Sequence, residues 1–550
     1  MPQRPSSGPG EDRTFDLIVI GAGINGAGIA RDAAMRGLRV LLLDKGDVSS
    51  GTSSWSTRLI HGGLRYLEHG ELGLVRESLR ERERLLRLAP HLVRPLPLLI
   101  PIYRGDRRGP WMIRAGMLAY DLLSLGKSLE SHRMLSMEEA LARAPGLDAQ
   151  GLQGAAIYYD AQVEYAERLV LENALSARNH GAVIRTYCRV DELLVEGSTV
   201  RGVRYTDLLT GEEGASRASV TVNVAGPWVD EVLTGTGQST RMVGGTKGSH
   251  LIVRPFPGAP QTALYVEARR DRRPYFIVPW NDLYLIGTTD VRYTGDLDRV
   301  VADEEEIEYL LQETNRVIPG GGLDRDAVLF TYAGIRPLPY HEHGSEGAIT
   351  RRHVIHDHAP GYQGFLSIVG GKLTTYRSLA EQVVDRAYHK LGVRPPQCLT
   401  RSTPLPGAPA VPPAPTGGVE LSAVTRRHLV RVYGSRAAEV LELARRHPEL
   451  AAPLSEESGV IGAELVYAFG HELAVTLGDA LLRRTMAGVG PRVGLDVLEA
   501  AAEIGLRYLG WDEARADREV AEYCAYIERF QPRELQARHR GAHGQGQLFR

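Results

Sequence analysis

Apolar runs separated by glycine shape the first part of the chain. Residues 15–20 read FDLIVI, the nearly continuous apolar pattern of a strand that is buried on both faces. A Gly-Ala-Gly turn interrupts this run, residues 24–36 follow with helical spacing, and residues 39–43 form a second apolar run that ends at Asp44. The pattern predicts a β-α-β unit with parallel strands.

The middle of the chain changes between helical and strand patterns. A long, arginine-rich helix is expected over residues 71–88, and the prolines of residues 90–110 exclude a helix there. Residues 182–226 alternate around a turn at Thr210–Gly211, and we expect their last run to return to the first sheet. Between residues 250 and 290, strand-like runs follow one another without a helix, which indicates an antiparallel sheet.

The C-terminal part has a different pattern. Residues 365–369 predict a buried strand, and residues 374–390 predict an amphipathic helix. Residues 404–418 (PLPGAPAVPPAPTGG) have the composition of a linker. Beyond them, residues 421–530 read as mostly helical, and the basic tail from residue 533 is expected to be flexible.

Composition narrows the class of protein. With 43% hydrophobic residues, 24% charged residues and a formal net charge of −2, the chain is typical of a globular protein without bulk attraction to nucleic acid. Residues 1–13 lack a signal-type apolar stretch, and no run has the length of a spanning helix. Three widely spaced cysteines allow no disulfide framework and no zinc site. We therefore expect a cytoplasmic protein without a bound metal.

The turn after the first predicted strand carries a G-x-G-x-x-G motif. Gly21 permits the tight turn, Gly23 lets the backbone approach a pyrophosphate, and Gly26 lets the helix pack on the strand. Asp44 is placed to accept hydrogen bonds from ribose hydroxyls. A simple glycine-rich turn is the alternative, but both strands and the acid favour a dinucleotide site. The motif alone does not distinguish FAD from NAD.

The following segment, residues 49–63 (SSGTSSWSTRLIHGG), is dense in hydroxyl groups and glycine and can wrap an extended cofactor. Here the chain resembles the FAD-dependent glycerol-3-phosphate dehydrogenases. The resemblance is carried, in the family's order, by VIGAGINGAGIARDAAMRG, TSSWSTRLIHGGLRYLEHGELGLVRESLRER, NVAGPWVD, KGSHLIV, IGTTDV, YAGIRPL and SIVGGKLTTYRSLAE. It covers residues 15–385, and residues 421–530 are similar to the family's helical C-terminal cap.

The resemblance implies bound FAD at the carboxyl edge of the first sheet. It also implies oxidation of sn-glycerol 3-phosphate to dihydroxyacetone phosphate, with electrons passed to a membrane quinone. The expected cofactor-binding residues are Gly21, Gly23, Asn25, Gly26, Asp44, Lys45, Thr52, Ser53, Ser54, Gly62, Gly63, Ala225, Gly226, Gly370, Gly371, Leu373, Thr374 and Thr375. Residues 370–375 lie between a strand and a helix, so that helix-terminal amides face the flavin.

A small phosphate dianion needs several permanent positive charges. Arg336, before a proline at a predicted turn, Arg351 and Lys372 are the candidates, and Lys372 could serve the phosphate or the flavin. Each cation could also be a solvated surface charge. Asp290, in Gly-Thr-Thr-Asp, is interpreted as the cap of a turn.

Oxidation of an alcohol also needs a base, and histidine suits neutral pH. His61, which directly follows the cofactor-wrapping segment, is the first candidate, and His250 is the second. Arg65 and Tyr66 are expected to complete the wall of the substrate pocket.

The stretch from Arg76 to Arg114 combines many arginines with apolar groups at residues 96–103, 111–113 and 117–118. This composition is typical of a surface that lies in lipid headgroups. The alternative is an arginine-rich helix paired to its own glutamates and docked on the domain. Because a quinone dissolved in lipid must reach the flavin, we expect peripheral binding to the anionic inner face of the plasma membrane.

The predicted fold class is α/β: a Rossmann-like FAD-binding domain, an antiparallel substrate-domain sheet and a helical C-terminal domain. The expected ranges are 14–90, 150–240 and 345–403 for the FAD-binding domain, 91–149 and 241–344 for the substrate domain, 404–418 for the linker, 419–532 for the helical domain and 533–550 for the tail. The functional alternatives are a glycerol-3-phosphate oxidase that reduces O₂, a flavin amine oxidase and a flavoprotein without catalysis. The sequence leaves a homodimer open.

Overall fold

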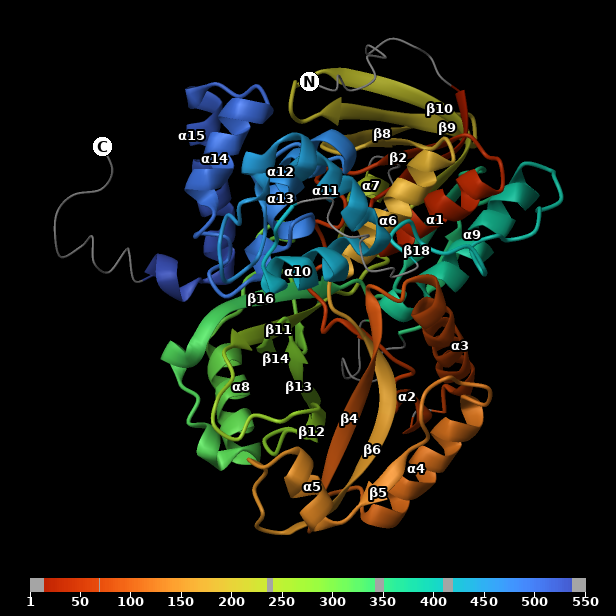
Figure 1. The fold of residues 1–550 in the computed structure, drawn as a ribbon. Helices are drawn as coiled ribbons and strands as arrows, with labels where there is room; N and C mark the ends of the chain where they lie inside the picture. Colours follow the sequence, from red (N-terminus) through yellow and green to blue (C-terminus); the bar gives the residue numbers. More distant parts are fainter. Residues whose placement is uncertain (1–13, 69, 235–240, 342–350, 409–418, 537–550) are drawn as a thin grey trace.

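The computed structural model describes residues 14–68, 70–234, 241–341, 351–408 and 419–536. Residues 1–13, residues 409–418 of the expected linker and the tail from residue 537 lie outside the described part. Figure 1 shows one sheet at the top of the view, a second sheet below it, and the C-terminal helices in blue. None of the helices within the described residues is both long and apolar enough to cross a bilayer.

The first sheet contains the predicted β-α-β unit. Its strands lie in the order β17-β18-β10-β1-β2-β7, and the β8–β9 hairpin extends β10. The central strands β2, β1, β10 and β18 are parallel neighbours. Their carboxyl ends therefore meet at one edge of the sheet, where ligands bind in open α/β sheets. The strands are β1 (Thr14–Ile20), β2 (Val40–Leu43), β7 (Val183–Arg185), β8 (Cys188–Glu196), β9 (Thr199–Asp207), β10 (Glu213–Asn223), β17 (Val354–Asp357) and β18 (Phe365–Val369).

Helices cover this sheet. α1 (Ile24–Met35) connects β1 to β2 and packs against α6 (Ala166–Asn179) and α9 (Tyr376–Lys390). The buried face of α1 is rich in Ala and Gly, so the neighbouring helices approach closely. The short α7 (Val229–Thr234) follows β10. The helices predicted at residues 24–36, 71–88 and 374–390 are all confirmed within two residues of their ends.

The second sheet has the order β15-β11-β14-β13-β12-β4-β6-β3, with β16 paired to β11 and β5 paired to β6. Its strands are β3 (Leu59–Ile60), β4 (Val93–Tyr103), β5 (Arg133–Leu135), β6 (Leu152–Val163), β11 (Thr246–Val253), β12 (Ala263–Glu267), β13 (Pro274–Trp280), β14 (Leu283–Gly287), β15 (Val291–Arg292) and β16 (Val328–Arg336). Around it lie α2 (Arg65–Glu68), α3 (Leu72–Leu88), α4 (Pro110–Leu123), α5 (Met137–Arg143) and α8 (Glu304–Val317).

The antiparallel pairing predicted for the strands of residues 250–290 is confirmed, because β11 pairs with β14, β14 with β13 and β13 with β12 in antiparallel fashion. One pairing with a strand outside that range is parallel, between β12 and β4 at Leu98 and Leu99. β4 and β12 are far apart in the sequence, so no tight turn connects them and requires them to be antiparallel. In addition, β6 belongs here and not to the FAD-binding sheet, since it pairs with β4 along almost the whole length of both strands.

The prolines of residues 90–110 explain why the strand β4, with which β6 pairs, was not predicted from the sequence. β4 contains Pro95, Pro97 and Pro101, yet it is a long strand. β12 pairs with β4 at only two positions, Leu98 and Leu99, so most residues along that edge of β4 need no backbone N–H for a neighbouring strand. Leu96, Leu98, Leu99, Ile100 and Ile102 are buried in this strand. The expectation that residues 96–103 form part of a lipid-facing surface is therefore wrong.

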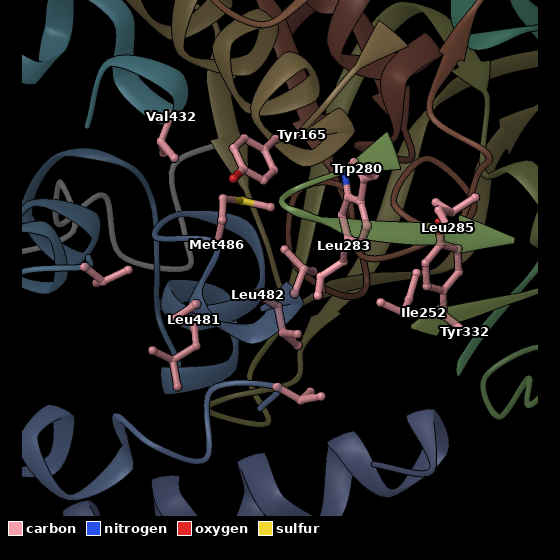
Figure 2. Close-up of a cluster of buried hydrophobic side chains, with 14 of the residues drawn as sticks. Tyr165, Ile252, Trp280, Leu283, Leu285, Tyr332, Val432, Leu481, Leu482 and Met486 are labelled. Atoms are coloured by element: carbon pink, nitrogen blue, oxygen red, sulfur yellow. The ribbon is translucent and has the colours of Figure 1, made fainter. Parts of the chain in front are cut away.

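The C-terminal part is helical, as predicted, and packs on both sheets. It contains α10 (Ala423–Tyr433), α11 (Ala437–Arg446), α12 (Gly462–His471), α13 (Leu477–Arg483), α14 (Leu498–Tyr508) and α15 (Glu513–Ile527). Figure 2 shows Leu481, Leu482 and Met486 from this region beside Trp280 and Leu283 of the second sheet, within one apolar core. The helical region is thus part of the same packed molecule.

Buried ion pairs reinforce this junction. Asp47, in the loop after β2, accepts hydrogen bonds from Arg483 (2.5 Å) and Arg484 (2.6 Å) at the end of α13. Arg168 of α6 pairs with Glu472 at 2.7 Å, and both side chains are fully buried. Removing one partner of such a pair is costly because it leaves a buried charge uncompensated. The C-terminal helices therefore hold the loop that follows β2.

Candidate active site

A cavity of about 1070 Å³ opens where the two sheets and the C-terminal helices meet. Its wall includes the G-x-G-x-x-G turn, the loop after β2, the 370–374 loop, and residues of β11, β13 and β16. Residues from α13 and α15 close one side. The parallel strand ends and the second sheet thus face one another across a single space.

The glycine turn has the geometry that a dinucleotide site requires. Gly21 has φ +112°, and a Cβ there would lie 2.7 Å from Val224 O. A Cβ on Gly26 would lie 1.7 Å from Gly21 O, so this position needs glycine for helix–strand packing. Gly23, at the N-cap of α1, has only Ser53 Oγ nearby, at 3.3 Å. Its open side faces the cavity.

Asp44 and Lys45, at the end of β2, line the cavity next to the glycine turn. The Asp44 carboxylate accepts the backbone N–H groups of Ala22 (2.6 Å) and Gly46 (2.8 Å). Burial raises the pKa of Asp44, while these two hydrogen bonds counteract the rise. Lys45 pairs with Asp298 at 2.8 Å and lies over the Trp228 ring. Asp44 thus orders the turn, and it retains lone pairs for a ribose hydroxyl.

Most of the other predicted cofactor residues line the cavity: Asn25, Thr52, Ser53, Gly63, Ala225, Gly226, Gly370, Gly371, Leu373 and Thr374. Ser53 Oγ accepts the Ile24 N–H at 3.0 Å, and Thr52 donates to Ile335 O at 2.7 Å. Gly370 and Gly371 have φ +78° and +98°, a conformation that turns the chain from β18 toward the N-terminus of α9.

Four predicted cofactor residues lie behind the wall. Gly26 packs against Gly21, as described above. Ser54 is fully buried and donates to Ser49 O at 2.5 Å. Gly62 donates its N–H toward Tyr120 and Asp160. Thr375 is buried at the N-cap of α9. The sequence of the hydroxyl-rich segment does not show which of its residues face the cavity and which are buried in the protein.

The residues present fit FAD. Asn25 Oδ1 and Trp228 Nε1 are buried and have no hydrogen-bond partner among the described residues, and both residues line the cavity. An acceptor and a donor of this kind are satisfied when a polar ligand is bound. The N-terminus of α1 is a further place where an anion can bind, although Ser53 Oγ already accepts the Ile24 N–H. Residues of the glycine turn would hold the pyrophosphate, and residues 370–374 would face the flavin.

His61 and Lys372 lie together on the wall beside the 370–374 loop. Lys372 Nζ donates to His61 O (3.0 Å) and to Ser78 Oγ (3.1 Å), and it lies over the Tyr66 ring. Burial lowers the pKa of Lys372 to about 7, although the Asp160 carboxylate raises it. Burial, together with the Lys372 charge, lowers the pKa of His61 to about 3. The imidazole is therefore neutral in the free chain.

Arg336 and Arg351 converge on Asp290. Arg336 Nη1 lies 3.1 Å from Asp290 Oδ1, and Arg351 Nη2 lies 3.5 Å from Asp290 Oδ2. Burial opposes ionisation of Asp290, but the two guanidinium groups outweigh it and lower the pKa of that carboxyl. Arg336 also donates to Thr288 Oγ1 at 3.0 Å. The interpretation of Asp290 as a turn cap is therefore wrong, because its carboxylate orients two arginines on the cavity wall.

His250 and Tyr66 also line the cavity. His250 is buried on β11, its Nε2 lies 2.9 Å from Thr57 Oγ1, and its Nδ1 has no partner among the described residues. Burial, followed by the Arg336 charge, lowers the pKa of His250 well below its ordinary value. The Arg65 side chain lies outside the described residues, so only its backbone, at the start of α2, is placed.

Sequence reasoning missed several aromatic residues of the wall. Trp55, Tyr158, Trp228, Tyr265 and Phe276 all line the cavity, and the Phe276 ring makes an edge contact with the His61 ring. Only Trp55 and Trp228 fall in stretches that carried the resemblance. Tyr265 and Phe276 belong to strands in which apolar and polar residues alternate. This alternation shows which residues share a face of the sheet, but it does not show which of the two faces lines the cavity.

The site can thus bind an extended dinucleotide beside a phosphate-sized anion. Three cations converge with a neutral imidazole in a largely buried space, which is the arrangement expected for redox chemistry on a small phosphorylated alcohol. Fold and site together define a flavin-dependent oxidoreductase.

Comparison with known proteins leads to the same class of protein. The family model for FAD dependent oxidoreductases matches residues 16–377, and the model for the C-terminal domain of alpha-glycerophosphate oxidase matches residues 398–516. The chain is 48% identical to a glycerol-3-phosphate dehydrogenase of Synechocystis, over 94% of this chain and 97% of the relative. It is 40% identical to the D-erythritol 1-phosphate dehydrogenase of Brucella abortus, over 86% and 95% of the two chains.

A solved structure is also similar. The glycerol-3-phosphate dehydrogenase of Bacillus halodurans, complexed with FAD, matches with a TM-score of 0.74 and 28% identity, over 94% of this chain and 95% of that one. The chain belongs to the FAD dependent oxidoreductase family and, within it, to the glycerol-3-phosphate dehydrogenases. Its cofactor is FAD.

Proposed function

We propose that this chain oxidises sn-glycerol 3-phosphate at C2 to dihydroxyacetone phosphate and passes the electrons to a membrane quinone. The observation that carries the proposal is that Arg336, Arg351, Lys372 and His61 all line one cavity, where Arg351 is close enough to act on the charges of Arg336 and Lys372, and Lys372 on that of His61. Guanidinium groups that are already oriented by Asp290 suit a phosphate dianion. The names of the relatives support the same substrate.

His61 is the proposed base. In the free chain, the Lys372 ammonium helps to keep the pKa of His61 near 3. A phosphate dianion beside Lys372 offsets that charge, so the imidazole becomes more basic when substrate binds. His61 then takes the C2 hydroxyl proton, while FAD, when bound, supplies the acceptor for the hydride. His250 is the alternative base, because its Nδ1 is buried without a partner among the described residues.

A longer polyol phosphate is a second candidate substrate. The relative from Brucella abortus is named for D-erythritol 1-phosphate, and it is 40% identical to this chain over 496 residues. Both substrates present a phosphate dianion and a secondary alcohol, so the Arg336, Arg351 and Lys372 cations do not discriminate between them. Discrimination rests on how the aromatic wall at Phe276 and Tyr265 accommodates the carbon chain.

Helix α4 is the proposed lipid-facing element. Trp111, Leu118 and Leu122 recur on one face of α4, and their side chains are 74%, 57% and 66% exposed. Ile113, Met117 and Tyr120 on the opposite face are buried. Exposed arginines at positions 104, 107 and 114 flank the apolar face. Cations beside an apolar helix face suit anionic headgroups and the acyl boundary. Figure 1 shows α4 at the bottom of the view.

The other arginines of the stretch from Arg76 to Arg114 fit the alternative interpretation, in which arginines pair with acidic residues of the protein itself. Arg82 is fully buried and pairs with Asp160 at 2.6 Å, while Arg84 pairs with Glu81. Arg108 lies 3.3 Å from Glu267. These arginines stabilise the domain, so the proposed membrane surface consists of α4 and the loop before it.

The test compares substrates and acceptors on the purified enzyme. We expect turnover of glycerol 3-phosphate with a soluble quinone, a much lower kcat/KM for D-erythritol 1-phosphate, and none for glycerol. Arg336→Ala should lower kcat/KM for glycerol 3-phosphate by about 30-fold or more, since a buried charged contact contributes about 2–5 kcal/mol. A preference for the erythritol substrate would contradict the substrate assignment. Rapid peroxide formation without quinone reduction would identify an oxidase.

A further inference from the structure

The peptide group between His61 and Gly62, called here the Gly62 peptide, is held from two sides. Its carbonyl, that of His61, accepts from Lys372 Nζ at 3.0 Å, and Lys372 Nζ also lies 3.4 Å from the carbonyl of Gly62. On the protein side, its N–H donates to the Tyr120 hydroxyl at 3.0 Å, with the Asp160 carboxylate 3.4 Å away. A Cβ on Gly62 would lie 2.4 Å from the Tyr120 oxygen. The position of this peptide therefore depends on Tyr120.

Tyr120 is itself fixed by a buried network. Its hydroxyl donates to Asp160 Oδ2 at 2.7 Å, and Asp160 Oδ1 accepts from Arg82 of α3 at 2.6 Å. Tyr120, Asp160 and Arg82 are all at most 2% exposed. Burial raises the pKa of Tyr120 well above its ordinary value, so the hydroxyl keeps its proton and acts as a donor to Asp160. Buried hydrogen bonds to a charged pair of this kind restrict the movement of the groups that they join.

Tyr120 lies on α4, on the face opposite Trp111, Leu118 and Leu122. The helix proposed to contact lipid is thus one hydrogen bond away from the peptide that binds Lys372. α4 also packs against α3, which supplies Arg82 and the Ser78 hydroxyl that accepts from Lys372. A small displacement of α4 would consequently move the Gly62 peptide and the ammonium group together.

We propose that Tyr120 is a positioning residue: its hydroxyl connects α4 to the Gly62 peptide and so sets the place of the Lys372 ammonium that receives the substrate phosphate. The proposal rests on the function proposed above. His61 has a second anchor that does not involve Tyr120, because its own N–H donates to Thr374 Oγ1 at 3.2 Å. The effect of Tyr120 is therefore on phosphate binding more than on the chemical step. Lipid contact at α4 is transmitted to substrate affinity through the same hydroxyl.

Tyr120→Phe tests the proposal in buffer, because it removes one oxygen and keeps the ring packed against Tyr158. Anaerobic reduction of the bound FAD gives the substrate dissociation constant and the limiting rate separately. We expect the dissociation constant for glycerol 3-phosphate to rise about ten-fold, as loss of a hydrogen bond in a charged network predicts. The limiting rate should change by less than about three-fold. The inhibition constant of inorganic phosphate, which probes the cations alone, should rise by the same factor as the dissociation constant.

Tyr165→Phe is the matched control. Tyr165 is equally buried, and its hydroxyl donates to Asn281 Oδ1 at 2.7 Å, outside the Gly62 network. This variant should lose a comparable amount of thermal stability and leave both phosphate constants unchanged. An unchanged phosphate constant in Tyr120→Phe, or an equal rise in Tyr165→Phe, would overturn the positioning role.

Vesicles containing anionic lipid test the connection to α4. Wild-type enzyme should bind glycerol 3-phosphate more tightly on vesicles than in buffer, with no quinone present. Tyr120→Phe should float with vesicles to the same extent but lose this change. A wild-type affinity that does not respond to vesicles, or an equal response in Tyr120→Phe, contradicts the connection. If glycerol 3-phosphate fails to reduce the wild-type flavin at all, the proposed function itself is wrong.

Discussion

At the scale of single residues, the main electrostatic feature is a buried lysine whose charge is easily lost. Burial lowers the pKa of Lys372 to about 7. The carboxylates of Asp160, Glu77 and Glu71 favour its charged form, whereas Arg351 opposes it. Binding of a phosphate dianion favours the ammonium form, so substrate and proton bind together.

This linkage predicts a pH dependence. Lys372 in the free enzyme loses its proton as pH rises through about 7, so the KM for glycerol 3-phosphate should increase above that pH, by up to about ten-fold per pH unit. Lys372→Arg keeps its charge at all these pH values and should lose the increase. A wild-type KM that stays constant between pH 6.5 and pH 9 would contradict the assignment of Lys372 to phosphate.

The base is tested by a second substitution. His61→Gln should retain FAD and bind glycerol 3-phosphate, but flavin reduction should slow by about 100-fold or more, the usual contribution of a general base. The measurement is anaerobic stopped-flow reduction, with His250→Gln as the control at the other candidate. If only the His250 variant is slow, the roles of the two histidines are exchanged.

Individual residues differed in how far the sequence could identify them. Arg336, Lys372 and His61 were predictable because they lie in short motifs that carry the family resemblance. Arg351 lies between two of those motifs, and the sequence offered it only as a further cation beside Arg352. The role of Asp290 was not predictable, since its partners are distant in sequence: Arg336 and Arg351 come from β16 and from the segment before β17. A carboxylate that follows Gly-Thr-Thr looks the same whether it caps a turn or orients two cations.

At the scale of elements, the turn between β1 and α1 contains one glycine that is expected to matter for cofactor binding and another that matters for folding. A side chain at Gly23 meets only Ser53 Oγ, whereas one at Gly26 collides with the backbone of Gly21. Gly23→Val should therefore fold but purify without FAD, because the valine occupies the pyrophosphate position. Gly26→Ala should destabilise the fold itself. Absorbance at the flavin band, together with a thermal melt, distinguishes the two outcomes; full flavin content in Gly23→Val would contradict the cofactor site.

Helix α4 carries the prediction about membranes. Replacing Arg104, Arg107 and Arg114 with glutamate should weaken binding to anionic vesicles, because each basic residue near such a surface contributes about 1 kcal/mol. Arg108 is left in place because it pairs with Glu267. Flavin reduction by substrate in buffer should stay intact. The control replaces Arg87, which is exposed near the end of α3. Flotation that is equal for both variants would exclude α4 as the contact.

The elements themselves were largely predictable where their pattern was local. β1, α1, β2, β18 and α9 were found because apolar periodicity and glycine define them within a few residues. β4 was not, since Pro95, Pro97 and Pro101 look like a loop until the sparse pairing with β12 is known. β6 was placed in the wrong sheet because pairing with β4 is a long-range property.

At the scale of the whole molecule, two sheets and a helical region enclose one cavity. The C-terminal helices contribute to its wall, and Arg483 and Arg484 hold Asp47 in the loop that follows β2. The sequence alone assigned no role to this region, because its motifs are weak and its contacts are entirely long-range. Its ion pairs with Asp47 indicate that it helps to hold this loop in place beside the cavity.

The central claim is that this enclosed flavin is reduced by a phosphorylated polyol. Its most direct test is an anaerobic titration of the purified yellow protein, followed by absorbance at the flavin band. The account predicts full bleaching by glycerol 3-phosphate with formation of dihydroxyacetone phosphate, and no bleaching by glycerol. A flavin that stays oxidised with glycerol 3-phosphate, or that is bleached equally well by an amine or an amino acid, would contradict it.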